Sequence, residues 1–223
     1  MEDTLPEKKT LEQYIIEIAN YIKERRETVI SISIATLVVI SIIIYIFVRL
    51  NIVRREAEEN LATLQSMVYT GTDLARALSL ADDIYQKYKN LIVGKNALFL
   101  KGEILYKIGK YKEAADVYKE VNRIMKHKTL SPLALYNLGK SLEGAGEYLQ
   151  AIDYYLEFTK KYPEHFLMPE VYFSMGLCYL AIGKTEDAVK TFEKIVINYP
   201  GSYYQKTADE YLKSLKSAPQ TEK

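Results

Sequence analysis

Three stretches of this chain share one pattern: ALFLKGEILYKIGKYKEAADVYKEV at 97–121, ALYNLGKSLEGAGEYLQAIDYYLEF at 134–158 and VYFSMGLCYLAIGKTEDAVKTFEKI at 171–195. Equivalent positions in successive stretches lie 37 residues apart. They are a first glycine (Gly102, Gly139, Gly176), a second glycine (Gly109, Gly146, Gly183), an alanine (Ala114, Ala151, Ala188) and an aromatic residue (Tyr118, Tyr155, Phe192). A fixed period of this length indicates stacked, repeated helical units.

Each shared position has a physical reason in a helical hairpin. The first glycine lets two helices approach closely, and the second allows a positive φ where the first helix ends. The alanine keeps the second helix near the first, and the aromatic ring one turn later fills the remaining space. Tyr162-Pro163 and Tyr199-Pro200, again 37 residues apart, end the second helices because proline cannot continue a helix. The pattern therefore predicts an all-α fold.

The pattern resembles the tetratricopeptide repeat, and the resemblance covers roughly residues 54–215. It implies an α-solenoid in which the first helix of each unit lines a concave groove. The usual period is about 34 residues, so each unit here is longer. The family's usual tryptophan is replaced by Leu98, Leu135 and Tyr172, and Lys101 stands where leucine is expected. We expect a connecting helix and a degenerate first repeat at 49–94, three repeats at 95–200, a closing helix at 201–216 and a disordered tail at 217–223.

Residues 29–48, VISISIATLVVISIIIYIFV, contain no charge, proline or glycine. As a helix they would be about 30 Å long, the thickness of the hydrocarbon core of a bilayer. A secretory signal peptide would have a shorter apolar region followed by a small-residue cleavage site, whereas RLNIVRRE follows here. The sequence therefore predicts a single transmembrane helix at 29–48 that contacts membrane lipid.

Residues 1–28 are predicted to form an amphipathic leader helix that runs directly into this span. Thr10 and Gln13 form a capping box, and Leu11, Ile15, Ile18 and Ile22 recur at helical spacing. Two interpretations remain open: a helix lying on the lipid interface, and a docking helix for a membrane partner. Basic residues are balanced on the two sides of the span, so the positive-inside rule leaves its orientation open.

Composition excludes several classes of function. The formal charge of +1 gives no basic face for nucleic acid. His127 and His165 have no metal ligand at a suitable spacing and are expected on the surface. Cys178, the single cysteine, lies within a first helix and is expected to be a small buried hydrophobe rather than a nucleophile. We expect no catalytic residue, no cofactor and no metal, and therefore no enzyme.

In the tetratricopeptide-repeat family, residues on the inner side of the first helices usually contact the ligand. By register, the resemblance implies Asn96, Phe99, Glu103, Tyr106 and Lys107 in the first unit, Leu133, Tyr136, Lys140 and Glu143 in the second, and Glu170, Phe173, Leu177 and Leu180 in the third. Phe99, Tyr136 and Phe173 are equivalent. Their rings either form a groove for an extended apolar or amphipathic peptide or pack against the neighbouring repeat. Co-chaperone repeats carry Lys and Asn where this chain has Phe99 and Glu103, so that role is not expected.

The layout resembles the bacterial ancillary SecYEG translocon subunit (YfgM-like) family. The leader up to Arg26, the span and YQKYKNLIVGKNALFLKGEILYKIGKYKEAADVY at 85–118 carry this resemblance. It implies a single-pass protein of the bacterial inner membrane with a cytoplasmic N-terminus and an extracytoplasmic repeat domain. Such a protein would sit beside the translocon and a periplasmic chaperone and assist newly exported proteins.

Other roles stay open. The Tyr-Pro endings and NYPGSYYQKTADEYLKSLK at 198–216 look more like outer-membrane-assembly and Tol–Pal-associated repeat proteins, which are scaffolds of the envelope. A structural scaffold that holds a homo-oligomer together, and a subunit that binds a membrane hydrolase, are the remaining alternatives.

Overall fold

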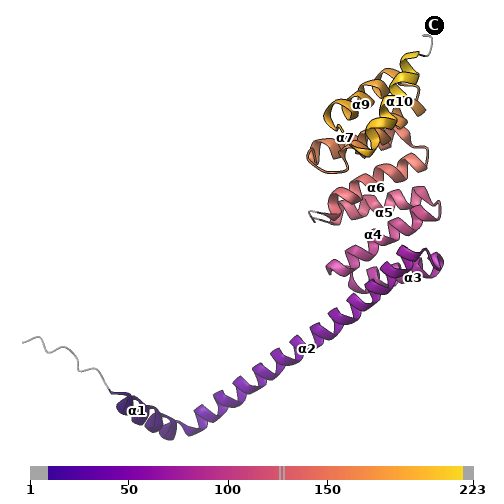
Figure 1. The fold of residues 1–223 in the computed structure, drawn as a ribbon. Coiled ribbons are helices and arrows are strands. Elements are labelled where there is room, and N and C mark those ends of the chain that lie inside the picture. The colour runs from indigo at the N-terminus through magenta and orange to yellow at the C-terminus, as the bar shows by residue number, and fades with distance from the viewer. Residues whose placement is uncertain (1–9, 126, 128, 218–223) are drawn as a thin grey trace, which may run out of the picture. The chain divides into compact units, whose positions relative to one another are not determined.

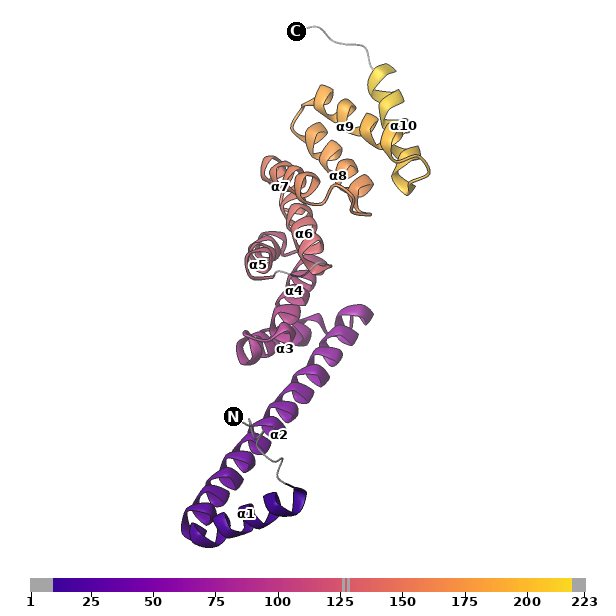
Figure 2. The same ribbon diagram turned by 90° about the vertical axis from the view of Figure 1, so that its left-hand side faces the viewer.

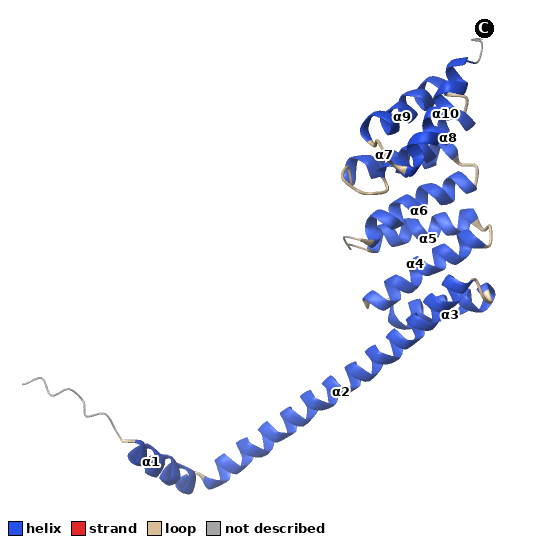
Figure 3. Cartoon of the chain, in the orientation of Figure 1, coloured by secondary structure: helices blue, strands red, loops and turns tan. Residues whose placement is uncertain are grey.

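The computed structural model describes residues 10–125, 127 and 129–217, and these form ten α-helices and no strand (Figure 3). The prediction of an all-α fold is therefore confirmed. The chain divides into two compact units, residues 1–56 and 57–223. Most of the predicted tail, 218–223, and the first nine residues lie outside the described residues.

The first unit contains α1 (Leu11–Glu24) and the beginning of α2 (Arg26–Thr70). The Thr10 backbone N–H donates to Gln13 Oε1 at 3.0 Å, as the capping box predicts. The prediction of one leader helix through residue 28 is wrong, because the helix is interrupted at Arg25 (φ −116°, ψ 36°). No proline or glycine marks this break, so the residue types around Arg25 predict no interruption.

Within the described residues, α2 is the one helix that is long and apolar enough to cross a membrane, judged by length and composition. None of its most apolar window is buried inside the protein. Hydroxyl groups in this stretch donate to carbonyls one turn earlier, including Ser33 Oγ to the Val29 carbonyl and Ser41 Oγ to the Leu37 carbonyl, both at 2.8 Å. The serine and threonine hydroxyls of the apolar stretch are thereby satisfied within the helix.

The second unit contains the end of α2 followed by α3 (Leu74–Tyr88), α4 (Ile92–Lys107), α5 (Tyr111–Ile124), α6 (Leu130–Gly144), α7 (Tyr148–Lys161), α8 (Met168–Ala181), α9 (Thr185–Asn198) and α10 (Tyr203–Ser217). From α3 onward each helix packs against the next, which gives the stack of hairpins in Figures 1 and 2. Helices two apart in the chain also meet, α6 with α8 and α8 with α10. The repeats predicted at 95–200 correspond in sequence to α4–α5, α6–α7 and α8–α9, and the predicted closing helix corresponds to α10.

The first glycine of each unit lies directly beneath the aromatic ring of the second helix. A Cβ atom built on Gly139 would lie 2.5 Å from the Tyr155 ring, and one built on Gly176 would lie 2.5 Å from the Phe192 ring. Both rings are fully buried. The glycine recurs in each repeat because any side chain at this position would occupy the space of the aromatic ring.

The turn after each first helix also repeats. Gly109, Gly146 and Gly183 have φ values of +79°, +78° and +75°. After Gly146, the Glu147 N–H donates to the Leu142 carbonyl at 2.9 Å, which closes the helix end as in a Schellman motif. The predicted role of the second glycine is therefore confirmed.

Lys101, which stands where the family has leucine, also has a structural reason. Its Nζ forms an ion pair with Asp82 of α3. The departure from the repeat pattern thus connects the first clear repeat to the helix that precedes it.

Candidate protein-binding groove

A groove of about 490 Å³ lies along the first helices of the first two repeats, α4 and α6. Its lining comes from these helices and from Tyr118 of α5: Phe99, Glu103, Tyr106, Lys107, Tyr118, Leu133, Tyr136, Asn137 and Lys140. Seven of these residues are among the predicted ligand contacts, and Tyr118 and Asn137 are additional. The floor is mainly aromatic and apolar, and the charges lie on Glu103, Lys107 and Lys140.

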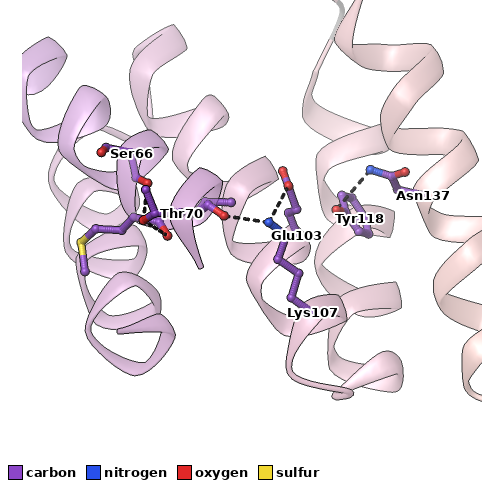
Figure 4. Close-up of polar contacts among 8 residues, drawn as sticks. Ser66, Thr70, Glu103, Lys107, Tyr118 and Asn137 are labelled. Carbon is purple, nitrogen blue, oxygen red and sulfur yellow. Dashed lines mark hydrogen bonds and ion pairs between the residues drawn. The ribbon is translucent and has the colours of Figure 1, made fainter. Parts of the chain in front are cut away.

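Lys107 connects the groove to the end of α2. Its Nζ donates to the Val68 carbonyl at 2.7 Å and lies 3.6 Å from Glu103 Oε1 (Figure 4). Val68 is in the last turn of α2, where carbonyls lack partners within the helix and a cation is favourable. The last turn of α2 has no basic residue of its own. Lys107 therefore supplies the missing cap and fixes one wall of the groove.

Tyr118 and Asn137 were not predicted as groove residues. The Asn137 side-chain amide donates to the Tyr118 hydroxyl at 3.2 Å, which joins α5 to α6 at the groove floor (Figure 4). The repeat pattern identified Tyr118 only as the ring that fills the space above Gly102. Its hydroxyl group extends past the contact with Gly102 to Asn137 in the groove lining, and the repeat pattern alone does not predict this position.

The three equivalent aromatic residues, Phe99, Tyr136 and Phe173, differ in whether they line the groove or pack against the neighbouring helices. Phe99 lines the groove and packs edge-on against Tyr118, with ring centroids 5.6 Å apart. Tyr136 also lines the groove, but it is only 7% exposed and its hydroxyl donates to Glu170 Oε1 of the next repeat at 2.7 Å. Phe173 packs against Tyr204 and Tyr211 of α10. The repeated aromatic position is therefore open at Phe99 and is inter-repeat packing at Phe173.

The remaining predicted residues do not line this groove. Glu143 accepts a hydrogen bond from the Tyr155 hydroxyl at 2.7 Å and pairs with Lys140 at 3.0 Å. Leu177 and Leu180 pack in the apolar cluster of α9 and α10. Asn96 is half-buried near the start of α4. In the third repeat the closing helix α10 covers part of the surface that a ligand would need.

Several tyrosine hydroxyls in this region are buried. Burial, followed by the neighbouring Glu170, raises the pKa of Tyr136, and burial raises the pKa of Tyr118 and of Tyr155. The folded protein thus holds these protons above about pH 10, where an unfolded chain releases them. The unfolded state then binds fewer protons, so stability falls as the pH rises.

We therefore expect the free energy of unfolding to fall steeply above about pH 10, by about 1.4 kcal/mol per pH unit for each buried tyrosine. Urea unfolding at a series of pH values measures this slope. Tyr118→Phe removes one of the titrating groups, and its slope should be smaller by the contribution of one tyrosine. If the slope is the same for both proteins, Tyr118 does not contribute to the loss of stability at high pH, and the prediction is wrong.

The other candidate chemical groups are structural. Cys178 is fully buried, and burial raises the pKa of its thiol to about 12, as expected for a small core residue. His127 is exposed, as predicted. His165 lies at the surface but is half-buried: its ring centroid is 5.4 Å from that of Phe158, and burial lowers its pKa. Among the residues that the structure describes, no group of His, Cys, Asp and Glu could hold a metal ion.

Comparison with known families identifies the repeats. Residues 69–124 match one model of the tetratricopeptide repeat, and residues 133–165 and 170–202 match another. Together these matches cover more than half of the chain. Among curated proteins, none matches this sequence significantly.

Solved structures show the same fold. A tetratricopeptide repeat protein from Parabacteroides merdae ATCC 43184 is 22% identical with a TM-score of 0.61, over 73% of this chain and 60% of that one. This chain therefore spans less than two thirds of that relative. MamA from Desulfovibrio magneticus RS-1, from residue 41 to its end, is 21% identical with a TM-score of 0.57, over 72% of this chain and 93% of that one. At these identities the likeness shows the fold.

Proposed function

This chain is a tetratricopeptide-repeat protein, and from that premise we propose that it is a membrane-anchored adaptor whose α4–α6 groove binds an extended, mainly apolar peptide segment. Tetratricopeptide repeats are scaffolds for protein–protein interaction, so the partner is a protein. In the finer form of the proposal, the repeat domain is extracytoplasmic and assists newly exported proteins beside the translocon and a periplasmic chaperone.

The groove is the observation that carries the proposal. Its volume of about 490 Å³ is that of a small-ligand or side-chain pocket, and it is enclosed mainly by aromatic and apolar side chains. Phe99 and Leu133 are both half-buried there, so each retains apolar surface that a partner can cover. Glu103 and Lys107 carry opposite charges at the same site, which suits the polar backbone of an extended peptide better than a strongly charged ligand.

Leu133→Glu tests the groove directly. A carboxylate in the apolar floor would be desolvated by the incoming peptide, so we expect binding to weaken at least tenfold, about 1.4 kcal/mol. The probe is an array of short peptides drawn from exported proteins, followed by fluorescence polarisation with the peptide that binds best.

The matched control is Leu149→Glu in α7, where the leucine is 62% exposed and does not line the groove. This variant should bind the peptide as the unmodified chain does. Equal affinity of all three proteins would count against the groove, and equal weakening by both variants would indicate a general loss of folding.

The membrane anchor is supported by the length and composition of α2 and by its exposed apolar side chains, including Leu37 and Phe47. The extracytoplasmic location and the translocon are supported by the resemblance of the layout to the YfgM-like family. Labelling with a membrane-impermeant maleimide tests the location, with cysteines introduced one at a time as Thr72→Cys and Ser217→Cys.

We expect both positions to be labelled in intact cells, because both are exposed in the repeat unit. Cys178 can remain in place, since its buried thiol should react only after unfolding and so provides an internal control. Protection of both positions until the cells are opened would place the repeats in the cytoplasm and overturn the translocon proposal.

An envelope-assembly scaffold is the second candidate. It is favoured by the Tyr-Pro endings of α7 and α9, where Tyr162 and Tyr199 follow the last helical residue. The two candidates differ in their neighbours. Crosslinking in cells should give translocon subunits in the first case and outer-membrane-assembly components in the second.

A further inference from the structure

The first helix, α1, has a complete apolar face that nothing in its own unit covers. No residue of α1 is buried, and Leu11, Ile15, Ile18 and Ile22 are between 46% and 80% exposed. At 3.6 residues per turn these four side chains lie on one stripe. Such a stripe requires an occupant, because a soluble protein rarely leaves a contiguous apolar helix face in water.

The residues around the stripe are typical of a helix at a membrane interface. At the same helical period, Tyr14 and Tyr21 fall together at one border of the stripe, and both are more than half exposed. Tyrosine favours the interface because its ring is apolar and its hydroxyl remains hydrated. Glu12, Asn20 and Lys23 lie on the opposite, mainly polar side, where Ile16 is the one large apolar side chain.

The short connection between α1 and α2 determines what can cover the apolar stripe of α1. A single residue, Arg25, separates the end of α1 from the start of α2, and the apolar stretch of α2 begins at Val29. If α2 crosses the bilayer, the C-terminal end of α1 cannot move more than a few ångströms from the bilayer surface, and the rest of the helix stays within its own length of about 21 Å. Partition of its apolar face into lipid then becomes an intramolecular step with a high effective concentration of lipid.

Charge at the junction agrees with this arrangement. Lys23, Arg25 and Arg26 lie where the two helices meet, with Glu24 and Glu27 among them, so the junction keeps a small net positive charge at the level that lipid phosphates would occupy. The break at Arg25 also separates the two helices, so that α1 does not continue the line of the span. The tether and the tyrosine border favour a lipid surface over a second protein as the occupant.

We propose that α1 is an interfacial helix, with Leu11, Ile15, Ile18 and Ile22 inserted among the lipids of the leaflet in which α2 begins. The inference rests on the proposed membrane anchor. It goes beyond the adaptor function, because it gives the chain a second lipid contact that is separate from the span and from the groove.

Tryptophan fluorescence tests the proposal cleanly, because the chain contains no tryptophan. Three single variants of the full chain are reconstituted in vesicles of phosphatidylcholine and phosphatidylglycerol: Ile18→Trp on the apolar face, Asn20→Trp on the polar face and Ile40→Trp in the apolar stretch of α2. Each is quenched in turn by acrylamide in the water and by lipids brominated at shallow or deep acyl positions.

We expect the Ile18→Trp emission to lie at shorter wavelength than that of Asn20→Trp and to be quenched several-fold more strongly by shallow-brominated lipid. An interfacial helix lies about 5–10 Å deep, so deep bromines should quench Ile18→Trp less than they quench Ile40→Trp. Asn20→Trp should respond mainly to acrylamide.

Two results would overturn the inference while leaving the anchor intact, both with Ile40→Trp quenched by lipid. In one, Ile18→Trp is as open to acrylamide as Asn20→Trp, and α1 lies in water. In the other, Ile18→Trp is shielded from both acrylamide and lipid, and a second copy or another protein covers the stripe. If Ile40→Trp is not quenched by lipid, the anchor itself fails, and the inference fails with it.

Discussion

Gly94→Ala is expected to destabilise the repeat domain by more than about 3 kcal/mol, the upper end of the range for overpacked sites. A Cβ atom on Gly94 would lie 2.2 Å from the Tyr88 carbonyl oxygen and 2.9 Å from the Lys89 nitrogen. These are backbone atoms, so no side-chain rotation can relieve the clash. The Tyr88 carbonyl is also held in place, because the Leu91 N–H donates to it at 2.8 Å.

The gain in helix propensity from glycine to alanine, about 1 kcal/mol, is too small to offset this cost. Urea unfolding followed by circular dichroism measures the change. Asn90→Ala is the matched control, because Asn90 is exposed in the same connection between α3 and α4. A Gly94→Ala variant as stable as this control would mean that α3 and α4 are farther apart than the structure shows.

Gly139→Ala is expected to cost about 2 kcal/mol, because a clash of about 3 kcal/mol is partly offset by better helix propensity. The new methyl group would lie 2.5 Å from the Tyr155 ring, which is fully buried and is held by its hydrogen bond to Glu143. The ring therefore has nowhere to move. Gly102→Ala, where the corresponding distance to the Tyr118 ring is 2.9 Å, should cost less.

A double mutant separates this clash from a general effect of the substitution. Tyr155→Leu shortens the side chain above Gly139, so Gly139→Ala should cost much less in that background than alone. We expect a coupling of about 1–2 kcal/mol between the two sites, within the usual range for residues in contact. Additive losses would show that the glycine is not there to make room for the ring.

Much of the fold could be predicted because the same glycine and aromatic positions recur in all three repeats, and each such pair forms the same packing contact. Gly139 and Tyr155 are 16 residues apart in the sequence, as are Gly176 and Phe192, and the structure places each pair in contact. Gly94 has no equivalent at the 37-residue interval, where Ser131 stands instead. Its close contact with the end of α3 therefore carried no repeating signal.

The candidate site could be predicted only in part. Register predicted Phe99, Tyr106 and Leu133 on one side of the repeats, and the structure places all three along one groove, because the first helices of equivalent hairpins turn equivalent faces inward. It could not predict that Phe173 would be covered, since that depends on Tyr204 and Tyr211 of the closing helix, which lies outside the repeat. The repeat pattern predicts the surface of a repeat that has another repeat after it. The third repeat is followed by the closing helix instead, and this helix covers part of its ligand-facing surface.

The central claim is that the α4–α6 groove of a membrane-anchored repeat domain holds a segment of a partner protein. Photocrosslinking in living cells tests it most directly, with a photoreactive phenylalanine derivative placed at position 133 in the groove or at position 119 on α5. Lys119 is exposed and does not line the groove. Mass spectrometry identifies the adducts. The proposal predicts adducts with translocon subunits or newly exported proteins from position 133 and none from position 119, whereas no adduct at 133, or the same adducts at both positions, would contradict it.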